Sequence, residues 1–215
     1  SVRAILMISE GRNFSVGGNI GVFRQNLEDL PRLIKRWAAD FHAGVSRLQR
    51  GDAPLVAAVQ GVCAGGGVSL AAGADYVIAA DDAQFVAAYV GLGFCVDGGG
   101  TVMLSRRMGQ ARARRFMMMG EKLSAAQALD AGLVDEVVPL ADLAERARAV
   151  AAGLAAGPTR AYGEIKRLFV SVEDTTLEGQ LELEALALAR CAGTADAREA
   201  ITAFTEKRKP QFEGR

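Results

Sequence analysis

The chain has 215 residues, of which 50% are hydrophobic and 23% are charged. This composition supports a sizeable buried core and argues against an intrinsically disordered protein. The 25 basic and 25 acidic residues give no net charge, so bulk electrostatics offers no support for nucleic-acid binding.

The cysteines and the single histidine limit the chemistry further. Cys63, Cys95 and Cys191 lie far apart and form no CxxC pair, which predicts free thiols in a reducing compartment, the cytoplasm. His42 is the single histidine, so we expect no metal site. The chain also lacks an uncharged apolar stretch of about 18 residues. We therefore expect no nucleic-acid partner and no membrane segment.

The first half of the chain alternates between apolar runs and helical patterns. Residues 2–8 predict a buried strand, and residues 27–50 repeat apolar side chains at the three- and four-residue steps of a helix. The chain starts directly on that strand without a methionine, so we expect upstream sequence to be missing. A strand, a small-residue helix, a strand and an extended segment are predicted next, at 55–60, 68–75, 76–80 and 84–90.

The second half becomes helical. A helix pair is predicted at 101–108 and 110–119, and Ser124 and Gln127 form a capping box that starts a further helix. Residues 133–139 predict an edge strand, and the pattern beyond Pro139 is helical, with breaks near residues 157–158, 171–175 and 193. We predict an α/β core over 1–140 and a helical region over 141–215.

Glycine turns are the first candidates for a ligand site. Triplets at 65–67 and 98–100 each follow an apolar run and precede a helix, where backbone amides can approach an anion closely. A third turn is Gly17-Gly18. A Gly-Gly turn has a purely structural role in most proteins, so this one alone is weak evidence for a ligand site. The chain has no GxxxxGK[ST] string, and valine replaces the third glycine of a GxGxxG motif at 91–96. Nucleotide hydrolysis and hydride transfer therefore lose support.

Several long strings resemble the crotonase (enoyl-CoA hydratase/isomerase) superfamily. They are GRNFSVGGNI (11–20), PLVAAVQGVCAGGGVSLAAGADYVIAADDAQF (54–85), GLGFCVDGGGTVMLSRRMGQARARRFMMMGEKLSAAQALDAGLVDEVVP (91–139) and AITAFTEKRKPQF (200–212). The resemblance implies an α/β spiral of β-β-α repeats, with a helical C-terminal region that mediates trimerisation. It also implies that the N-terminal part of the fold is absent here. We expect a homotrimer or homohexamer that binds an acyl-CoA substrate and needs no cofactor beyond the coenzyme A of that substrate.

The resemblance also assigns roles to residues of this chain. It implies that the amides of Gly18 and Gly66 bond the thioester oxygen of the substrate. Hydratases of the family use two glutamates, and Ser69 and Tyr89 stand at those two positions. Addition of water needs one group to activate the water and one to deliver a proton, so ordinary hydratase activity is in doubt.

One carboxylate remains, Asp97, directly before the second glycine triplet. The resemblance is closest to the ring-1,2-epoxyphenylacetyl-CoA isomerase-like subgroup, in which an aspartate in this setting is the acid/base. A helix N-cap is the alternative role for Asp97. We expect Val16, Ser69 and Tyr89 to line the substrate site. Lys207, in the final helix, is expected to approach the phosphates of coenzyme A.

His42 indicates an alternative function for the protein. Dehalogenases of the family that act on 4-chlorobenzoyl-CoA use an aspartate nucleophile, a tryptophan and a histidine, and Asp97, Tyr89 and His42 match those positions, with Tyr replacing Trp. A packing or hydrogen-bonding role for His42 stays open beside a role in substrate binding. The main hypothesis is an enoyl-CoA isomerase. Its alternatives are a hydratase or dehalogenase-like hydrolase, and a catalytically silent binding protein.

Overall fold

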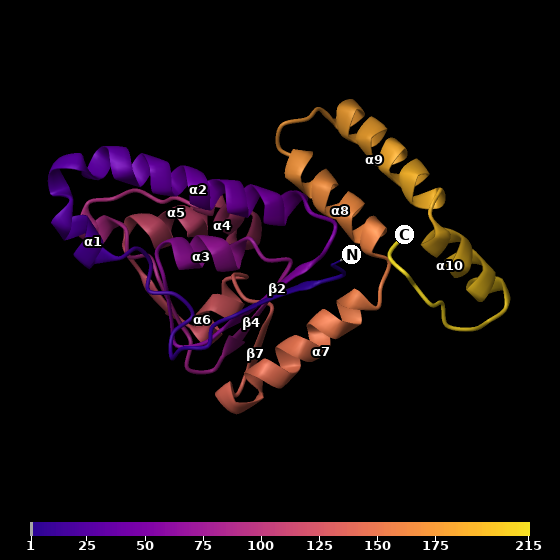
Figure 1. Cartoon of the computed structure of the whole chain (residues 1–215), viewed down its shortest axis with the longest axis horizontal. Helices are drawn as coiled ribbons and strands as arrows, with labels where there is room; N and C mark the ends of the chain where they lie inside the picture. Colours follow the sequence, from indigo (N-terminus) through magenta and orange to yellow (C-terminus); the bar gives the residue numbers. More distant parts are fainter. Residues whose placement is uncertain (1) are drawn as a thin grey trace. The chain divides into compact units, whose positions relative to one another are not determined.

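Figure 1 shows the computed structural model of the chain, which describes residues 2–215. The described chain forms two compact units, each assembled from separate stretches. The sheet unit comprises Met7–Ser46 and Val56–Ala147, and the helical unit comprises the residues up to Leu6 together with Arg47–Leu55 and Arg148–Arg215. The predicted division of the sequence at residue 140 stays a prediction about domains.

The strands build two sheets. The larger has the order β1 (Ile5–Ile8), β2 (Leu55–Val59), β4 (Tyr76–Ala80) and β7 (Glu136–Val138), and β2, β4 and β7 are parallel. The smaller has the order β3 (Val62–Ala64), β5 (Gln84–Val86) and β6 (Lys122–Ser124). All of β2 is buried, as expected for a parallel strand covered on both faces. The predicted edge strand at 133–139 is confirmed, because β7 ends the larger sheet.

Strand pairs alternate between the two sheets. β2 lies in the larger sheet and β3 in the smaller, and the helix α3 (Gly66–Ala72) follows. The same order recurs in β4, β5, a 3-10 turn (Val90–Leu92), α4 (Gly100–Met108) and α5 (Gln110–Met118). The second pair lies parallel to the first in both sheets. This β-β-α repeat agrees with the spiral that the resemblance predicts.

The helices of the sheet unit begin close to their predicted positions. The helix predicted over 27–50 is a 3-10 turn (Leu27–Asp29) followed by α2 (Leu30–Arg50), and a short helix that the sequence does not predict, α1 (Ile20–Gln25), precedes it. The capping box is confirmed at the start of α6 (Ala125–Asp130). There the Ser124 hydroxyl accepts from the Gln127 amide, and the Gln127 side chain accepts from the Ser124 amide.

The chain beyond Pro139 is helical, with its breaks where glycine, proline and polar residues predict them. A 3-10 turn (Leu140–Asp142) leads into helices that are α7 (Leu143–Ala155), α8 (Thr159–Ser171), α9 (Leu177–Ala192) and α10 (Ala195–Thr205). None of the helices in residues 2–215 is long and apolar enough to cross a membrane. The three cysteines are free, as predicted.

Lys207 does not lie in the final helix, so that part of its predicted placement is wrong. Helix α10 ends at Thr205, and Lys207 adopts a left-handed backbone with φ 56°. Its N–H donates to the Phe204 carbonyl, and the Arg208 N–H reaches back to the Ala203 carbonyl. This geometry is that of a residue that terminates a helix, a position at which glycine is the usual choice.

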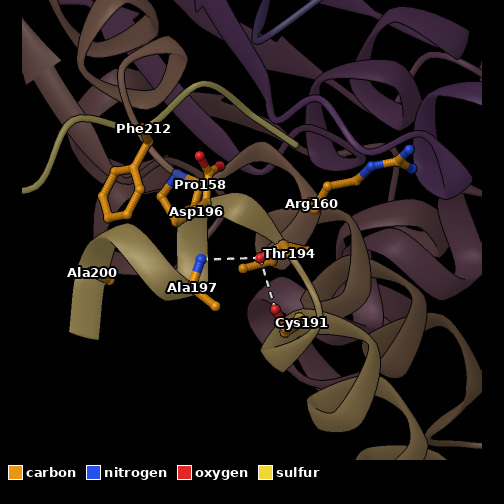
Figure 2. Close-up of a pocket in the computed structure, with 9 residues that line it drawn as sticks. Pro158, Arg160, Cys191, Thr194, Asp196, Ala197, Ala200 and Phe212 are labelled. Atoms are coloured by element: carbon orange, nitrogen blue, oxygen red, sulfur yellow. Dashed lines mark hydrogen bonds between the residues drawn. The ribbon is translucent and has the colours of Figure 1, made fainter. Parts of the chain in front are cut away.

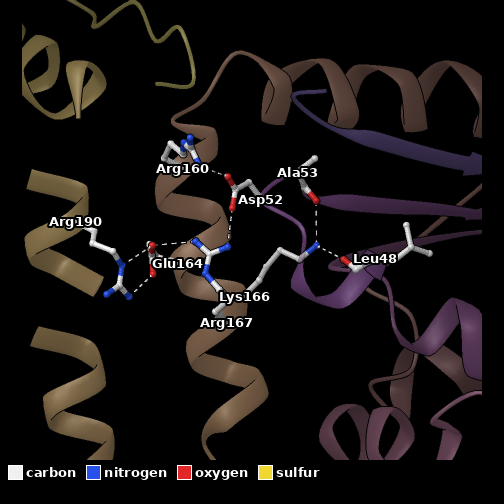
Figure 3. Close-up of polar contacts among 8 residues, drawn as sticks. All are labelled: Leu48, Asp52, Ala53, Arg160, Glu164, Lys166, Arg167 and Arg190. Carbon is white, nitrogen blue, oxygen red and sulfur yellow. Dashed lines mark hydrogen bonds and ion pairs between the residues drawn. The ribbon is translucent and has the colours of Figure 1, made fainter. Parts of the chain in front are cut away.

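Charged groups join α8 to its neighbours within the helical unit (Figure 3). Asp52 accepts from Arg160 and Arg167, and the Glu164 carboxylate binds Arg167 and Arg190. Lys166 is buried, and its ammonium donates at 3.0 Å to each of the carbonyls of Leu48 and Ala53. These bonds satisfy the carbonyl of Leu48 in the last turn of α2, a common use of lysine at helix ends, and that of Ala53 in the segment that follows.

Candidate active site

The Gly17-Gly18 turn is tied to β3. Ser15 forms a parallel bridge with Cys63, and the Ala64 N–H donates to the Ser15 carbonyl at 2.8 Å. The segment at Ser15 and β3 run in the same direction at this bridge, so the residues that follow them emerge at the same edge. The Gly17-Gly18 turn therefore lies next to the first glycine triplet, 65–67, although more than forty residues separate them along the chain.

The two glycine turns are in contact. A Cβ on Gly17 would lie 3.9 Å from the Cα of Gly65, and both residues have positive φ, 84° and 55°. Gly66 is the first residue of α3, where helix amides lack partners inside the helix. Within residues 2–215, the N–H groups of Gly18 and Gly66 donate to no acceptor. The adjacent turns thus offer two unpaired N–H donors.

Asp97 faces the turn at Gly66. A Cβ on Gly66 would lie 3.4 Å from Oδ1 of Asp97, and the Tyr89 hydroxyl donates to the same oxygen at 2.6 Å. The Ser69 hydroxyl lies 3.4 Å from the Tyr89 oxygen and is fully buried. Because the single Tyr89 proton is used on Asp97, Ser69 is the donor to Tyr89. Three residues predicted from the sequence therefore form one hydrogen-bonded chain that ends on a carboxylate.

The hydroxyl of Tyr89 stays protonated. Burial, followed by the hydrogen bond to Asp97, raises the pKa of the Tyr89 hydroxyl above its ordinary value near 10. It therefore acts as a hydrogen-bond donor to the carboxylate at neutral pH. Asp97 is not a helix cap, because Gly99 occupies the N-cap position of α4 without a side-chain cap. The alternative role for Asp97 is wrong.

His42 supports the turn behind Asp97. The Gly98 N–H donates to Nε2 of His42 at 3.0 Å. A backbone amide can only donate, so Nε2 accepts and the neutral ring carries its proton on Nδ1. His42 lies on α2, and Gly98 has φ 63°. The hydrogen-bonding role that the sequence left open is the one observed, and it joins α2 to the turn before α4.

Aromatic side chains cover these turns. The Phe41 ring would lie 3.5 Å from a Cβ on Gly66 and 2.6 Å from one on Gly98. A second aromatic group is centred on Phe23 of α1, which stacks on Trp37 and meets Phe94 edge to face, both with centroids 6.0 Å apart. The tip of the Phe23 ring also lies 2.6 Å from a Cβ built on Gly18.

The sequence does not indicate these aromatic residues as parts of the site. Trp37 and Phe41 are four residues apart on the apolar face of the predicted helix, where a core role is the ordinary interpretation. Phe23 lies on a helix that the sequence does not predict. Their glycine neighbours are distant in sequence, so no local pattern indicates the contact.

Two predicted residues lie apart from this chain of contacts. Val16 precedes the Gly17-Gly18 turn and is 66% exposed. Lys207 belongs to the helical unit, and its role toward coenzyme A phosphates stays a prediction.

The helical unit also holds a pocket of about 200 Å³, which Figure 2 shows. None of the predicted site residues lines it; its wall is largely apolar and includes Pro158, Ala161, Ala197, Ala200 and Phe212.

Comparison with known proteins shows which family of proteins the chain resembles. The whole chain, residues 1–215, matches the family model described as enoyl-CoA hydratase/isomerase. It is 38% identical over 221 residues to the 1,2-epoxyphenylacetyl-CoA isomerase of Escherichia coli (strain K12), covering 100% of this chain and 82% of that protein. It is 37% identical to a probable enoyl-CoA hydratase of Rhodobacter capsulatus, covering 99% and 82%. The crystal structure of an enoyl-CoA hydratase from Polaromonas sp. JS666 matches with a TM-score of 0.92 at 34% identity, covering 98% of this chain and 82% of that chain.

Proposed function

The chain belongs to the enoyl-CoA hydratase/isomerase family, and from this premise we propose that it is an isomerase that moves a double bond in an acyl-CoA thioester. The observation that carries the proposal is the pairing of one carboxylate with a tyrosine at the Gly66 turn. A carboxylate that accepts from a protonated tyrosine is a base with one free oxygen. The two positions that resemble the hydratase glutamates hold Ser69 and Tyr89.

The amides of Gly18 and Gly66 would stabilise the enolate. Removal of a proton next to a thioester moves negative charge onto the thioester oxygen. Two fixed N–H donors at that oxygen hold the charge without reorganising, and loss of one such donor raises a barrier by about 3 kcal/mol in comparable sites. The contact between their two turns supports this pairing.

Asp97 would move the proton. Its carboxylate takes the proton from C2 of a 3-enoyl-CoA, and the C–H electron pair enters a dienolate. The same group then returns the proton to C4, which leaves the 2-enoyl product and restores the carboxylate. One acid/base group is sufficient, because the substrate gains and loses a single proton and no water is added.

The two catalytic alternatives, hydration and dehalogenase-like hydrolysis, each depend on a group that is already engaged in a hydrogen bond in this site. Hydration needs a second acid/base group, and the Tyr89 hydroxyl is engaged as a donor to Asp97. The dehalogenase-like alternative rests on a histidine at the position of His42, whereas Nε2 of His42 accepts from the Gly98 amide. A catalytically silent protein would turn over no acyl-CoA in a broad panel.

Replacement of Asp97 by asparagine tests the proposal. We expect the Asp97→Asn variant to lose about 10²- to 10⁴-fold in kcat for conversion of 3-enoyl-CoA to 2-enoyl-CoA, the range for loss of an acid/base group. Isomerisation and hydration are followed in parallel with the wild-type protein. Asp130→Asn is the matched control, because Asp130 is an exposed aspartate at the end of α6.

Two results would overturn the proposal. One is an Asp97→Asn variant that keeps most of the isomerase turnover. The other is a wild-type protein that hydrates 2-enoyl-CoA faster than it isomerises 3-enoyl-CoA.

A further inference from the structure

We infer that Tyr89 is a positioning residue that holds the Asp97 carboxylate so that one oxygen, Oδ2, takes and returns the substrate proton. This inference rests on the proposed function of Asp97 and deepens it. It gives Tyr89 a role beyond the expectation that this residue lines the substrate site.

The first support is the occupancy of the two carboxylate oxygens. Tyr89 donates to Oδ1 at 2.6 Å, which is short for a neutral donor and typical of a hydrogen bond to an ionised acceptor. Among residues 2–215, no group donates to Oδ2. A hydrogen bond to one oxygen of a carboxylate fixes the rotation of the group and distinguishes its two oxygens.

The second support is that the Tyr89 hydroxyl is itself held on its other side. Ser69 donates to it from a fully buried position on α3. The Ser69 hydroxyl lies close to Gly100, since a Cβ built on Gly100 would lie 2.4 Å from Oγ. The Tyr89 oxygen therefore has a buried partner on α3 in addition to its bond to Asp97.

The third support is the backbone of Tyr89. Its carbonyl accepts the amides of Leu92 and Phe94, both at 3.0 Å, and Gly93 between them adopts a left-handed conformation. This compact turn lies between Tyr89 and Asp97, which is eight residues later. Both ends of the hydrogen bond thus lie on one short segment, part of which is closed by backbone bonds.

The chemical consequence concerns the fate of the proton. With Oδ1 occupied, the C2 proton moves to Oδ2 while its electron pair enters the dienolate, and Oδ2 then gives the proton to C4. Without the tyrosine hydroxyl, the carboxylate can rotate, and solvent can reach both oxygens. The proton on Asp97 then exchanges with water before it reaches C4.

The test compares Tyr89→Phe with wild type in two measurements. We expect kcat to fall about 10- to 100-fold, the range for a hydrogen bond to a charged group, with KM little changed because the hydroxyl does not touch substrate. We also expect a substrate deuterated at C2 to carry less deuterium to C4 in a single turnover, because the freed carboxylate exchanges its proton with water.

Tyr76→Phe is the matched control. The Tyr76 hydroxyl donates to a carboxylate of the same unit, Glu136, at 3.3 Å, so this variant also loses one tyrosine–carboxylate bond. It should leave kcat and the deuterium transfer unchanged. Ser69→Ala provides an independent probe, and it should lower the deuterium transfer in the same direction as Tyr89→Phe, by a smaller amount.

The outcomes separate this inference from the proposed function. A Tyr89→Phe variant with raised KM, unchanged kcat and unchanged deuterium transfer would place the hydroxyl on the substrate and overturn the inference. The inference also fails if Tyr89→Phe does not fold and Ser69→Ala leaves the deuterium transfer unchanged. In both cases loss of activity in Asp97→Asn would still support the isomerase. If Asp97→Asn stays active, the proposed function fails, and with it the role of Tyr89.

Discussion

Single glycines of the candidate site differ in the space that surrounds them. A Cβ on Gly66 would meet Oδ1 of Asp97 at 3.4 Å and the Phe41 ring at 3.5 Å, which are ordinary contacts. A Cβ on Gly98 would lie 2.6 Å from Phe41 and 3.1 Å from Ser69, and the φ of 63° adds backbone strain. The fold therefore tolerates a side chain at position 66, whereas the packing and the backbone of the turn require glycine at position 98.

Alanine at these two positions should separate activity from stability. We expect Gly66→Ala to change the free energy of unfolding by less than about 1 kcal/mol. It should still reduce isomerase activity, because the methyl group occupies the space beside Asp97. Gly98→Ala should destabilise the protein by about 2–4 kcal/mol through a left-handed alanine and overpacking. Urea unfolding and the isomerase assay measure both effects, and a Gly98→Ala protein as stable as wild type would contradict the expected overpacking.

Helix α2 contributes to the site through two neighbouring side chains. Phe41 lies against the turns at Gly66 and Gly98, and His42 accepts from the Gly98 amide. An amide at a partly buried position is destabilising without an acceptor. The helix therefore stabilises the glycine turn that leads from Asp97 into α4, and it does so by packing and by one hydrogen bond.

Two replacements of His42 should have different effects. His42→Leu removes the acceptor and should destabilise the protein by about 1–3 kcal/mol, the penalty for an unsatisfied buried amide. His42→Gln keeps an oxygen that can accept and should retain most of the stability. Hydrogen exchange at the Gly98 amide reports the bond directly. Exchange as slow in His42→Leu as in wild type would show that this bond is dispensable.

In the whole molecule, the helical unit depends on charged side chains as well as on apolar packing. The Arg190 guanidinium binds both oxygens of Glu164, and Arg167 adds a third contact.

The same unit exposes large apolar side chains, among them Leu188 of α9 and Phe204 of α10, which are 72% and 85% exposed. The homotrimer or homohexamer expected from the resemblance stays a prediction.

Acid should weaken the helical unit through Glu164. The hydrogen bonds from Arg190, with those from Arg167, lower the pKa of Glu164 from 4.5 to about 2. A carboxyl group whose pKa is lower in the folded state stabilises the fold above pH 4.5, and this contribution is lost as the pH falls toward 2. We expect wild type to exceed Glu164→Gln in stability by about 0.5–1 kcal/mol at neutral pH, the upper range for exposed ion pairs.

Unfolding of both proteins between pH 7 and pH 2 measures this effect. The stability difference should shrink below pH 4.5 and disappear near the pKa of about 2. A difference that stays constant over this range would mean that Glu164 contributes through packing rather than through its charge.

The sequence by itself determined the elements that carry strong local signals. The 3.6-residue repeat located α2, the capping box located α6, and glycine and proline located the breaks between the C-terminal helices. Elements without such signals were missed: α1 has six residues, and β3 and β6 have three residues each. Three residues are too few for alternation alone to predict a strand, whereas β5 and β7, equally short, lie within the longer predicted segments 84–90 and 133–139.

Only the tertiary structure decided how the candidate site is assembled. The resemblance indicated Gly18, Gly66, Tyr89 and Asp97 as site residues, but not which of them touch. The parallel bridge between Ser15 and Cys63 brings the two glycine turns together, and residues 56 positions apart form the bond from Gly98 to His42. Such contacts depend on the path of the whole chain, because a side chain finds its partner only after distant strands and helices have packed.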